Sequence, residues 1–165
     1  MKKLTRTLLL ALALVLSLAA VGCSAQPEAP AEVNVPVQDI ADDLLSMEDQ
    51  FGSMMDFGEE TVTEMCGLDY SMLSEYSIND AMMNVKSHIL YIAKLNNLED
   101  MDAVKAAFQK RLELMQETFA TYLPDQYEIA MNGQIVDNGK YVMLVVSEDS
   151  QKVVDRFNEL LTPEA

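Results

Sequence analysis

The strongest fold signal in the sequence is the run Q-I-V-D-N-G-K-Y-V-M-L-V-V-S, residues 134–147. Asn138 and Gly139 divide this run into two segments, and Asn-Gly between such segments is the strongest short signal for a β-hairpin, because both residues accept positive φ. Bulky and β-branched side chains fill the second segment, from Tyr141 to Val146, and they favour a strand. The run therefore predicts a hairpin of two antiparallel strands.

Both flanks of this hairpin show helical periodicity. Before it, apolar residues recur at steps of three and four over residues 99–122, which predicts a long amphipathic helix with charged side chains elsewhere on its surface. Pro124 breaks this helix, and one or two further helical turns end at Gly133. After the hairpin, the apolar spacing predicts a final helix over residues 150–161. The stripe of the long helix contains Met101, Val104, Phe108, Leu112, Met115, Phe119 and Tyr122, and its charged residues are Lys105, Lys110, Arg111, Glu113 and Glu117.

Two more strands are predicted upstream of the long helix. The first begins near Glu75, and the second is the run H-I-L-Y-I-A-K, residues 88–94, with a turn over residues 80–86 between them. The second strand is apolar on both faces. This pattern is typical of a central strand that is covered on each side, or of a strand that is covered on one face and presents a partly apolar surface on the other.

The segments from residue 37 onward predict a single α+β domain, residues 37–165. Apolar spacing predicts a first helix over residues 37–48 and a short helix over residues 59–66, with a loop or short turn over residues 50–58 between them. These N-terminal helices are followed by the order ββαββα. Because hairpins join strands in antiparallel pairs, we expect an antiparallel sheet with the two later helices packed on one face.

The N-terminus has the order of a secretory signal: basic residues, an apolar run from Leu8 to Val21, and small residues around Cys23. A cysteine at this place is where bacterial lipoproteins are acylated and then cleaved, although Ala20 occupies the position where a lipobox usually has Leu. We expect residues 1–23 to be a lipoprotein signal peptide and Cys23 to carry the acyl chains that hold the protein at the membrane. An ordinary cleaved signal peptide and an uncleaved membrane anchor are the alternatives.

The residues that follow the signal predict a tether and an acidic domain. Residues 24–36 are small, acidic and rich in proline, which predicts a flexible segment between anchor and domain, on the extracytoplasmic face of the membrane. Without Lys2, Lys3 and Arg6 of the signal, eight basic residues remain against 27 acidic ones, a formal charge of −19. Such a surface repels nucleic acid and anionic lipid headgroups, so the acyl anchor is expected to provide the membrane attachment.

Catalytic motifs are absent from the sequence: neither H-E-x-x-H, G-x-S-x-G, a P-loop nor zinc-spaced Cys and His residues occur. His88 and Cys66 form the one nucleophilic pair that the composition allows. We interpret His88 as a partly exposed strand residue and Cys66 as a buried residue near a helix C-terminus, where the pKa of a thiol is raised. The 12 methionines are interpreted as adaptable core residues rather than copper ligands. We therefore expect a protein that is not an enzyme and has no cofactor or metal site.

A candidate partner contact lies in the turn predicted between the first two strands, at Met82, Met83 and Asn84. If both methionines are exposed there, a flexible apolar tip on an acidic domain indicates contact with a protein or peptide. Packing of the turn over the edge of the sheet is the alternative.

Four stretches resemble bacterial lipoproteins of Gram-positive organisms that share domain of unknown function 4358. These stretches are G-L-D-Y-S-M-L-S-E-Y at 67–76, M-M-N-V at 82–85, Y-L-P-D-Q-Y at 122–127 and G-K-Y-V-M-L-V-V-S at 139–147. They span almost the whole folded region, and their order and spacing match. The resemblance implies a small lipid-anchored extracytoplasmic domain and carries no assigned activity.

One function is expected, with two alternatives. The expected function is that of a non-enzymatic module, anchored by lipid outside the cytoplasmic membrane, that contacts an envelope protein partner. A small-molecule or cation-binding lipoprotein would instead need a concave pocket or converging carboxylates. A hydrolase of envelope material would need Cys66, His88 or a carboxylate pair in a cleft.

Overall fold

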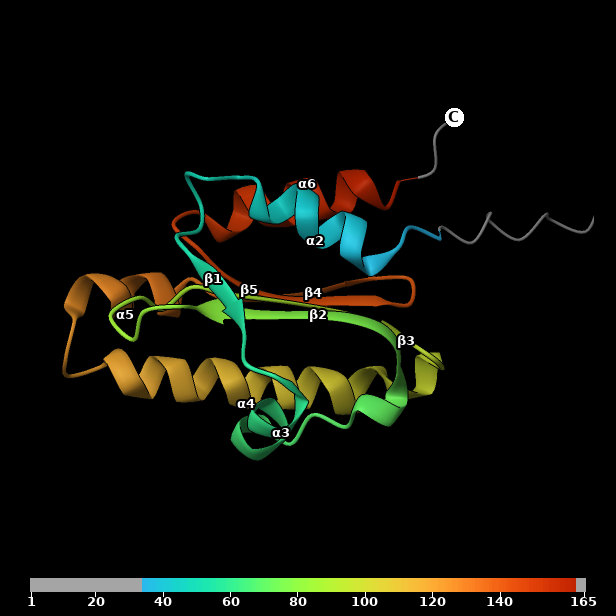
Figure 1. Cartoon of the computed structure of the whole chain (residues 1–165), viewed down its shortest axis with the longest axis horizontal. Helices are drawn as coiled ribbons and strands as arrows, with labels where there is room; N and C mark the ends of the chain where they lie inside the picture. The colour runs from blue at the N-terminus through green and yellow to red at the C-terminus, as the bar shows by residue number, and fades with distance from the viewer. Residues whose placement is uncertain (1–33, 163–165) are drawn as a thin grey trace, which may run out of the picture. The chain divides into compact units, whose positions relative to one another are not determined.

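The computed structural model of the protein describes residues 34–162. The expected signal peptide with Cys23 and nearly all of the expected tether lie outside the described residues. The sheet consists of β1 (Met54–Asp56), β2 (Leu73–Ala81), β3 (Ile89–Leu95), β4 (Gln134–Asn138) and β5 (Tyr141–Val146). Their order across the sheet is β1-β2-β3-β5-β4, and each neighbouring pair is antiparallel (Figure 1).

The described helices are α2 (Val37–Leu45), α3 (Glu59–Cys66), α4 (Met101–Phe119), α5 (Pro124–Met131) and α6 (Ser150–Leu160), with the short 3-10 turns η1 (Tyr70–Met72) and η2 (Leu98–Asp100). The α+β class and the antiparallel sheet are confirmed, and α4 and α6 follow their pairs of strands as expected. Strand β1 differs from the expectation, because the segment that contains it is expected to be a loop or turn and instead pairs with β2. None of these helices is long and apolar enough to cross a membrane.

The two central strands are buried on both faces. Alternate side chains of β3 and β5 point to opposite sides of the sheet, as the strand period of two requires. Tyr91 and Leu144 belong to the hydrophobic cluster that contains side chains of α3 and α4. Ile92 and Met143, each one residue away along its strand, belong to the cluster that contains side chains of α2 and α6. Within β3 and β5, Lys94 alone is not fully buried.

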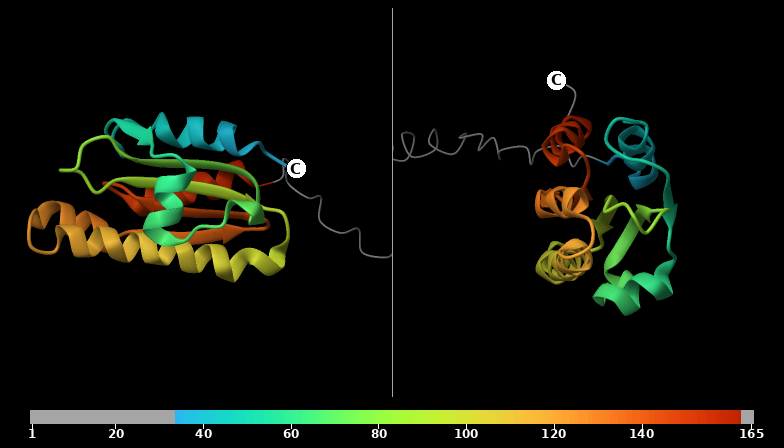
Figure 2. Two further views of the ribbon diagram at one scale, coloured as in Figure 1. Left: turned by 60° about the horizontal axis from the view of Figure 1, so that its bottom comes forward. Right: turned by 90° about the vertical axis from the view of Figure 1, so that its left-hand side faces the viewer.

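The expectation that both later helices cover one face of the sheet is wrong. α4 packs on one face with α3, and α6 packs on the opposite face beside α2 (Figures 1 and 2). The cause is the apolar character of β3 and β5 on both sides, because a single helical layer would leave side chains such as Leu90 and Ile92 in water. Of the two alternatives for the H-I-L-Y-I-A-K strand, coverage on each side is therefore confirmed.

The β4–β5 hairpin is confirmed, but its turn lies one residue later than the Asn-Gly signal implies. Asn138 pairs with Tyr141, so the two turn residues are Gly139 and Lys140. Gly139 has a φ of 59°, and within the described residues positive φ occurs only at glycines. Positive φ at the first turn position alone fits the type II′ turn rather than the type I′ turn that Asn-Gly favours.

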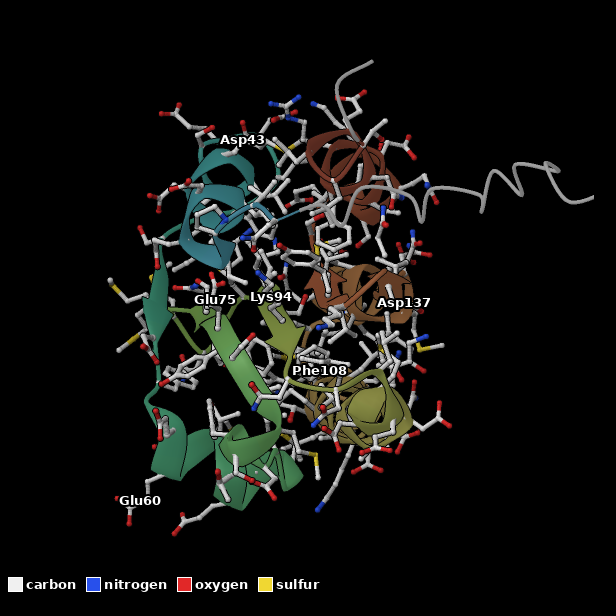
Figure 3. The ribbon with its side chains drawn as sticks, turned by 90° about the vertical axis from the view of Figure 1, so that its right-hand side faces the viewer. Asp43, Glu60, Glu75, Lys94, Phe108 and Asp137 are labelled. Atoms are coloured by element: carbon white, nitrogen blue, oxygen red, sulfur yellow. The ribbon has the colours of Figure 1, made fainter. Side chains whose placement is uncertain are left out.

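Polar contacts attach α2 to the sheet and to α6. The Glu75 carboxylate of β2 accepts a hydrogen bond of 2.8 Å from the Val37 N–H and pairs with Lys94 of β3 at 3.2 Å (Figure 3). Arg156 of α6 donates two hydrogen bonds, of 2.8 and 2.7 Å, to Asp43 of α2. Glu75 lies near the start of β2, so its contacts are at the end of this strand that is opposite to the β2–β3 loop.

Candidate functional site

The β2–β3 loop, residues 82–88, presents an apolar tip at one end of the sheet. Met82 and Met83 are each 56% exposed, and Val85 is 40% exposed. Asn84 is exposed between them. The structure thus places the three candidate contact residues together in an exposed turn, which meets the condition set by the sequence for a partner contact. Whether a partner binds there stays a prediction.

Hydrogen bonds hold the backbone of this loop. The Lys86 N–H donates to the Met83 carbonyl at 3.0 Å and closes a turn. The Ser87 N–H donates to Oε1 of Gln126, in α5, at 3.0 Å. A loop whose backbone is already fixed loses less conformational entropy when a partner binds to its side chains.

A pocket of about 250 Å³, here called the α4 pocket, opens beside the loop. Met83, Asn84 and Lys86 line it from the loop, and the second half of α4 lines it from the helix. Most of the lining is apolar, and charged groups enter it at Lys86, Asp80 and Arg111. Besides Met83, the apolar side chains of the lining are Phe57, Met65, Ala81, Leu114, Met115 and Phe119.

A buried ion pair forms part of the α4 pocket. The Arg111 guanidinium of α4 donates from Nη2 to Asp80 Oδ1, and the Tyr91 hydroxyl of β3 donates to Asp80 Oδ2. Nε of Arg111 donates to the Tyr91 oxygen at 3.2 Å. The exposed fraction is 4% for Arg111, 2% for Asp80 and 0% for Tyr91. These side chains join α4 to two strands, and both oxygens of Asp80 are engaged.

Burial raises the pKa of the Asp80 carboxyl, and the Arg111 charge and the Tyr91 hydrogen bond oppose that rise. Burial also raises the pKa of the Tyr91 hydroxyl, and the Asp80 charge adds to the rise. Tyr91 therefore stays protonated and remains the donor to Asp80. A carboxylate with both oxygens bonded, beside a guanidinium that keeps its proton, is poorly prepared to act as a general base.

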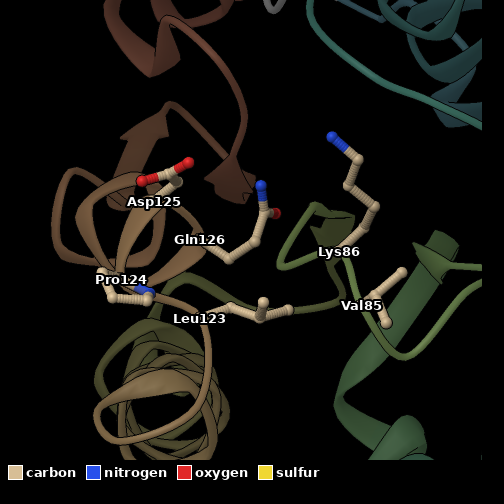
Figure 4. A pocket seen from close by; sticks show the side chains of 6 residues that line it. All are labelled: Val85, Lys86, Leu123, Pro124, Asp125 and Gln126. Carbon is tan, nitrogen blue, oxygen red and sulfur yellow. The ribbon is translucent and has the colours of Figure 1, made fainter.

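A second pocket, of about 300 Å³, also borders the loop (Figure 4). Val85 and Lys86 line it from the loop, and residues 123–126 line it from the start of α5. Lys86 contributes to both pockets. Met83 lines the α4 pocket and Val85 lines the second pocket, so the turn that carries them, here called the ridge, adjoins both hollows. The ridge together with the α4 pocket is the candidate functional site.

His88 is buried, and its interpretation as a partly exposed residue is wrong. It is 2% exposed and directly precedes β3. Its Nδ1 accepts a hydrogen bond of 3.2 Å from the Gly52 N–H, so the neutral ring carries its proton on Nε2. Nε2 lies 3.4 Å from Glu148 Oε1 and has no hydrogen-bond partner within residues 34–162. Burial lowers the pKa of His88; the Glu148 charge acts against this, and the Lys86 charge adds to it.

Cys66 is buried, as its sequence position predicts. It is 3% exposed, and its thiol donates to the Val62 carbonyl at 3.2 Å. Burial raises the pKa of the Cys66 thiol, which disfavours the reactive thiolate. Cys66 belongs to the cluster on the α4 side of the sheet, whereas His88 contacts Phe51 and Gly52 on the α2 side, so the structure does not assemble the pair into a dyad.

Acidic side chains gather along α3 without forming a metal site. A broad groove of about 610 Å³ is lined by Glu59, Glu60, Glu64 and Asp69 among other residues. Within the described residues, however, no group of three or more His, Cys, Asp or Glu side chains is arranged to hold a metal ion. The groove therefore offers a carboxylate surface rather than a coordination sphere.

Arg111 and Asp80 are the site residues that the sequence interpretation missed. The sequence pattern predicts Arg111 among the charged residues outside the apolar stripe of the long helix, but the structure buries it. Helical spacing does indicate the burial of Arg111, because this residue lies seven residues after Val104 and four before Met115, on the face of the apolar stripe. Asp80 likewise lies two residues after the buried Ile78, on the same face of β2.

Comparison with known proteins gives one family. A family model described as a domain of unknown function (DUF4358) matches residues 47–147, more than half of the chain. No curated protein and no solved structure matches the chain. The matched segment begins just after α2 and ends just after β5, so it contains the sheet, the β2–β3 loop and the α4 pocket.

Removing one partner of the buried ion pair will destabilise the domain. Arg111→Met leaves a buried carboxylate and Asp80→Leu leaves a buried guanidinium, so each single variant should lose about 3–5 kcal/mol of unfolding free energy. The double variant removes both charges and should lose much less than the two single losses together. Urea unfolding followed by circular dichroism measures this coupling. Strictly additive losses would show that the two charges do not depend on each other.

Acidification will destabilise the domain through His88. The unfolded chain binds a proton near the ordinary histidine pKa of about 6.5, whereas the folded pKa is lower. The stabilisation is therefore complete above about pH 6.5 and is lost as the pH falls toward the folded pKa. His88→Asn keeps an acceptor for the Gly52 N–H and cannot titrate, so its unfolding free energy should change less between pH 7.5 and 5.5. Equal pH dependence of both chains, measured by urea unfolding, would contradict this role.

Proposed function

This chain belongs to the family described as domain of unknown function DUF4358, and from this premise we propose that it is a non-enzymatic module that binds a partner protein through the β2–β3 loop. The observation that carries the proposal is the exposure of Met82, Met83 and Val85 on a loop with a fixed backbone. Methionine adapts its shape to a partner, and adjacent exposed apolar side chains are a feature of contact surfaces.

The charged groups of the site support a binding role over a catalytic one. Asp80 is held by Arg111 and Tyr91, and the Cys66 thiol is buried with a raised pKa. His88 accepts a backbone hydrogen bond on one ring nitrogen and is shielded from solvent on the other. Each of these groups makes contacts that serve the structure. The pocket would therefore recognise a partner through its shape and charge.

A small-molecule-binding role is the second candidate. The α4 pocket favours it, because an apolar cavity with a few converging polar groups is the usual form of a ligand site. Its volume of about 250 Å³ is below the usual range of about 300–1,000 Å³ for such sites. The exposed ridge next to the pocket adds apolar surface that a small ligand would leave uncovered, and this favours a protein partner.

The module is further proposed to work at the outer face of the cytoplasmic membrane. Its support is the sequence of the N-terminus, where basic residues, an apolar run and Cys23 follow the order of a lipoprotein signal. The proline-rich residues 24–36 would give the domain reach from an acyl anchor toward other proteins of the envelope.

Cys23→Ala should release the protein from the membrane or leave its signal unprocessed, because the acyl chains have no other attachment in this interpretation. Labelling of host cells with a palmitate analogue, followed by separation of membrane and soluble fractions, measures both effects. Cys66→Ser is the matched control and should keep the label and the membrane attachment. Normal processing and membrane retention of the Cys23→Ala chain would reject lipidation at this residue.

A photo-crosslinking residue, p-benzoylphenylalanine, at position 83 of the full chain should give a discrete adduct in intact host cells. The same residue at position 98 is the control, because Leu98 is 59% exposed at the far end of β3. Val85→Asp in the chain that is labelled at position 83 should lower the yield by more than about tenfold, since an unpaired charge would be buried in the contact. Equal adducts from both positions, or none from position 83, would contradict a partner at this loop.

A further inference from the structure

We propose that the α4 pocket receives one large apolar side chain of the partner protein, and that Lys or Arg residues near it in the partner's sequence bind carboxylates of α3. The inference rests on the proposed function and names the chemistry of the partner, an extended segment with an apolar anchor and a basic flank. Two features of the molecule support it: the paired charges inside the pocket and the acidic surface on the other side of α3.

The size and lining of the α4 pocket suit one apolar side chain. Its volume is about 250 Å³, and Phe57, Met65, Leu114 and Met115 supply apolar surface inside it. The exposed Met83 lines it from the ridge. A large side chain that is buried in a pocket of this kind is the usual centre of a protein contact, and the surrounding surface excludes water from it.

The charged groups of the pocket lining are already paired. Asp80 and Arg111 form a buried ion pair. The Lys86 ammonium lies 3.9 Å from Glu148 Oε1, and this oxygen lies 3.4 Å from Nε2 of His88, on the α2 side of the sheet. The ammonium is therefore directed away from α4. A charged side chain in the pocket would lose its hydration without gaining a free counterion, whereas an apolar side chain would not.

The surface next to the pocket is acidic. Met65 lines the pocket and Glu64, its neighbour in α3, lines the broad groove on the other side of this helix. Lys110 of α4 is near enough to act on the Cys66 thiol. Residues 53–72, however, contain neither Lys nor Arg, so carboxylates prevail there. The acidic residues of this segment are Asp56, Glu59, Glu60, Glu64 and Asp69.

Two of these carboxylates are available to a cationic side chain. Glu60 and Glu64 are exposed, and within residues 34–162 their side chains make no hydrogen bond or ion pair. Glu59, by contrast, accepts a hydrogen bond from the Tyr76 hydroxyl. A Lys or Arg residue of a partner can therefore bind Glu60 and Glu64 without breaking an interaction of the domain.

The distribution of charge along the chain favours a basic partner on this side. No Lys or Arg occurs from residue 7 to residue 85, so α3, β1 and β2 contain acidic residues only. An uneven distribution of this kind attracts the opposite charge to one part of the surface. The Debye length is about 8 Å at physiological salt, so the carboxylates closest to the bound segment have the largest effect.

The width of α3 sets the spacing between the anchor and the basic flank. A helix with its side chains is about 10–12 Å across. An extended chain advances about 3.3 Å per residue, so three or four residues lead from the pocket across α3 to the groove. We therefore expect the first Lys or Arg of the partner three or four positions from its apolar anchor.

The test uses the full chain in phosphatidylcholine nanodiscs, which carry no net charge, with ¹³C-labelled methionine methyl groups. The ligand is the peptide acetyl-Phe-Gly-Ser-Lys-Lys-Lys-amide, which has the expected anchor and spacing and no charged terminus. It should shift the signals of Met65 and Met115 in the pocket and leave Met131 and Met143, outside it, unchanged. Replacing its Phe by Ala, or its three Lys by Glu, should weaken binding at least about tenfold at low salt.

Two double variants test the role of α3. Glu60→Gln/Glu64→Gln changes only exposed side chains and should weaken binding of the lysine peptide at least about threefold. It should leave binding of the neutral peptide acetyl-Phe-Gly-Ser-Gln-Gln-Gln-amide unchanged. Glu99→Gln/Glu159→Gln is the matched control, because it removes two exposed carboxylates from η2 and α6 and changes the net charge equally. It should keep the affinity of the wild-type chain.

Four results would overturn the proposal: no shift of the pocket signals, equal binding of the lysine and glutamate peptides, equal binding of the Phe and Ala peptides, and equal losses in the two double variants. The last result would show that net charge, and not the surface of α3, attracts the peptide. An adduct at position 83 in cells without any pocket shift would leave the partner contact standing and reject only the anchor and its basic flank.

Discussion

The constraint on which the rest of the structure depends is the burial of β3 and β5 on both faces. These neighbouring strands carry apolar side chains at almost every position, so each face of the sheet needs a helical cover. A buried Leu, Ile, Val or Met side chain is worth about 1.5–3 kcal/mol, and a domain has only about 5–15 kcal/mol of net stability. If Leu90, Ile92, Met143 and Val145 were left exposed to water, most of this net stability would be lost. α4 and α6 therefore occupy opposite faces.

Within the α4 layer, the contact among Asp80, Arg111 and Tyr91 specifies how the helix is placed on the sheet. A purely apolar stripe can slide or rotate on an apolar face at small cost, whereas a buried guanidinium must meet its carboxylate. Because Asp80 is the next-to-last residue of β2, this contact ties α4 to the end of the sheet where the β2–β3 loop begins. The same ion pair thus positions the helix and places a paired guanidinium and carboxylate in the lining of the pocket.

The candidate site is built from segments that lie far apart in the sequence. α3 supplies Met65, the β2–β3 loop supplies Met83 and Lys86, and α4 supplies Arg111 and Met115. All of these lie inside the segment that matches the family model, whereas α2 and α6 lie outside it. The layer that bears the site belongs to the family domain, and the opposite layer mainly completes the burial of the sheet.

Local pattern in the sequence determined the long helix, the hairpin, the doubly apolar strand and the turn that carries Met82 and Met83, because periodicity and turn chemistry depend on neighbouring residues. It did not determine which face α6 covers, the strand pairing of β1, or the burial of Arg111 and His88. Those depend on contacts between distant segments: Arg111 needs Asp80, 31 residues away, and His88 needs Gly52, 36 residues away. The periodicity of the sequence shows which side chains share one face of a helix or strand. Only tertiary packing decides which element covers that face and which buried polar groups pair with each other.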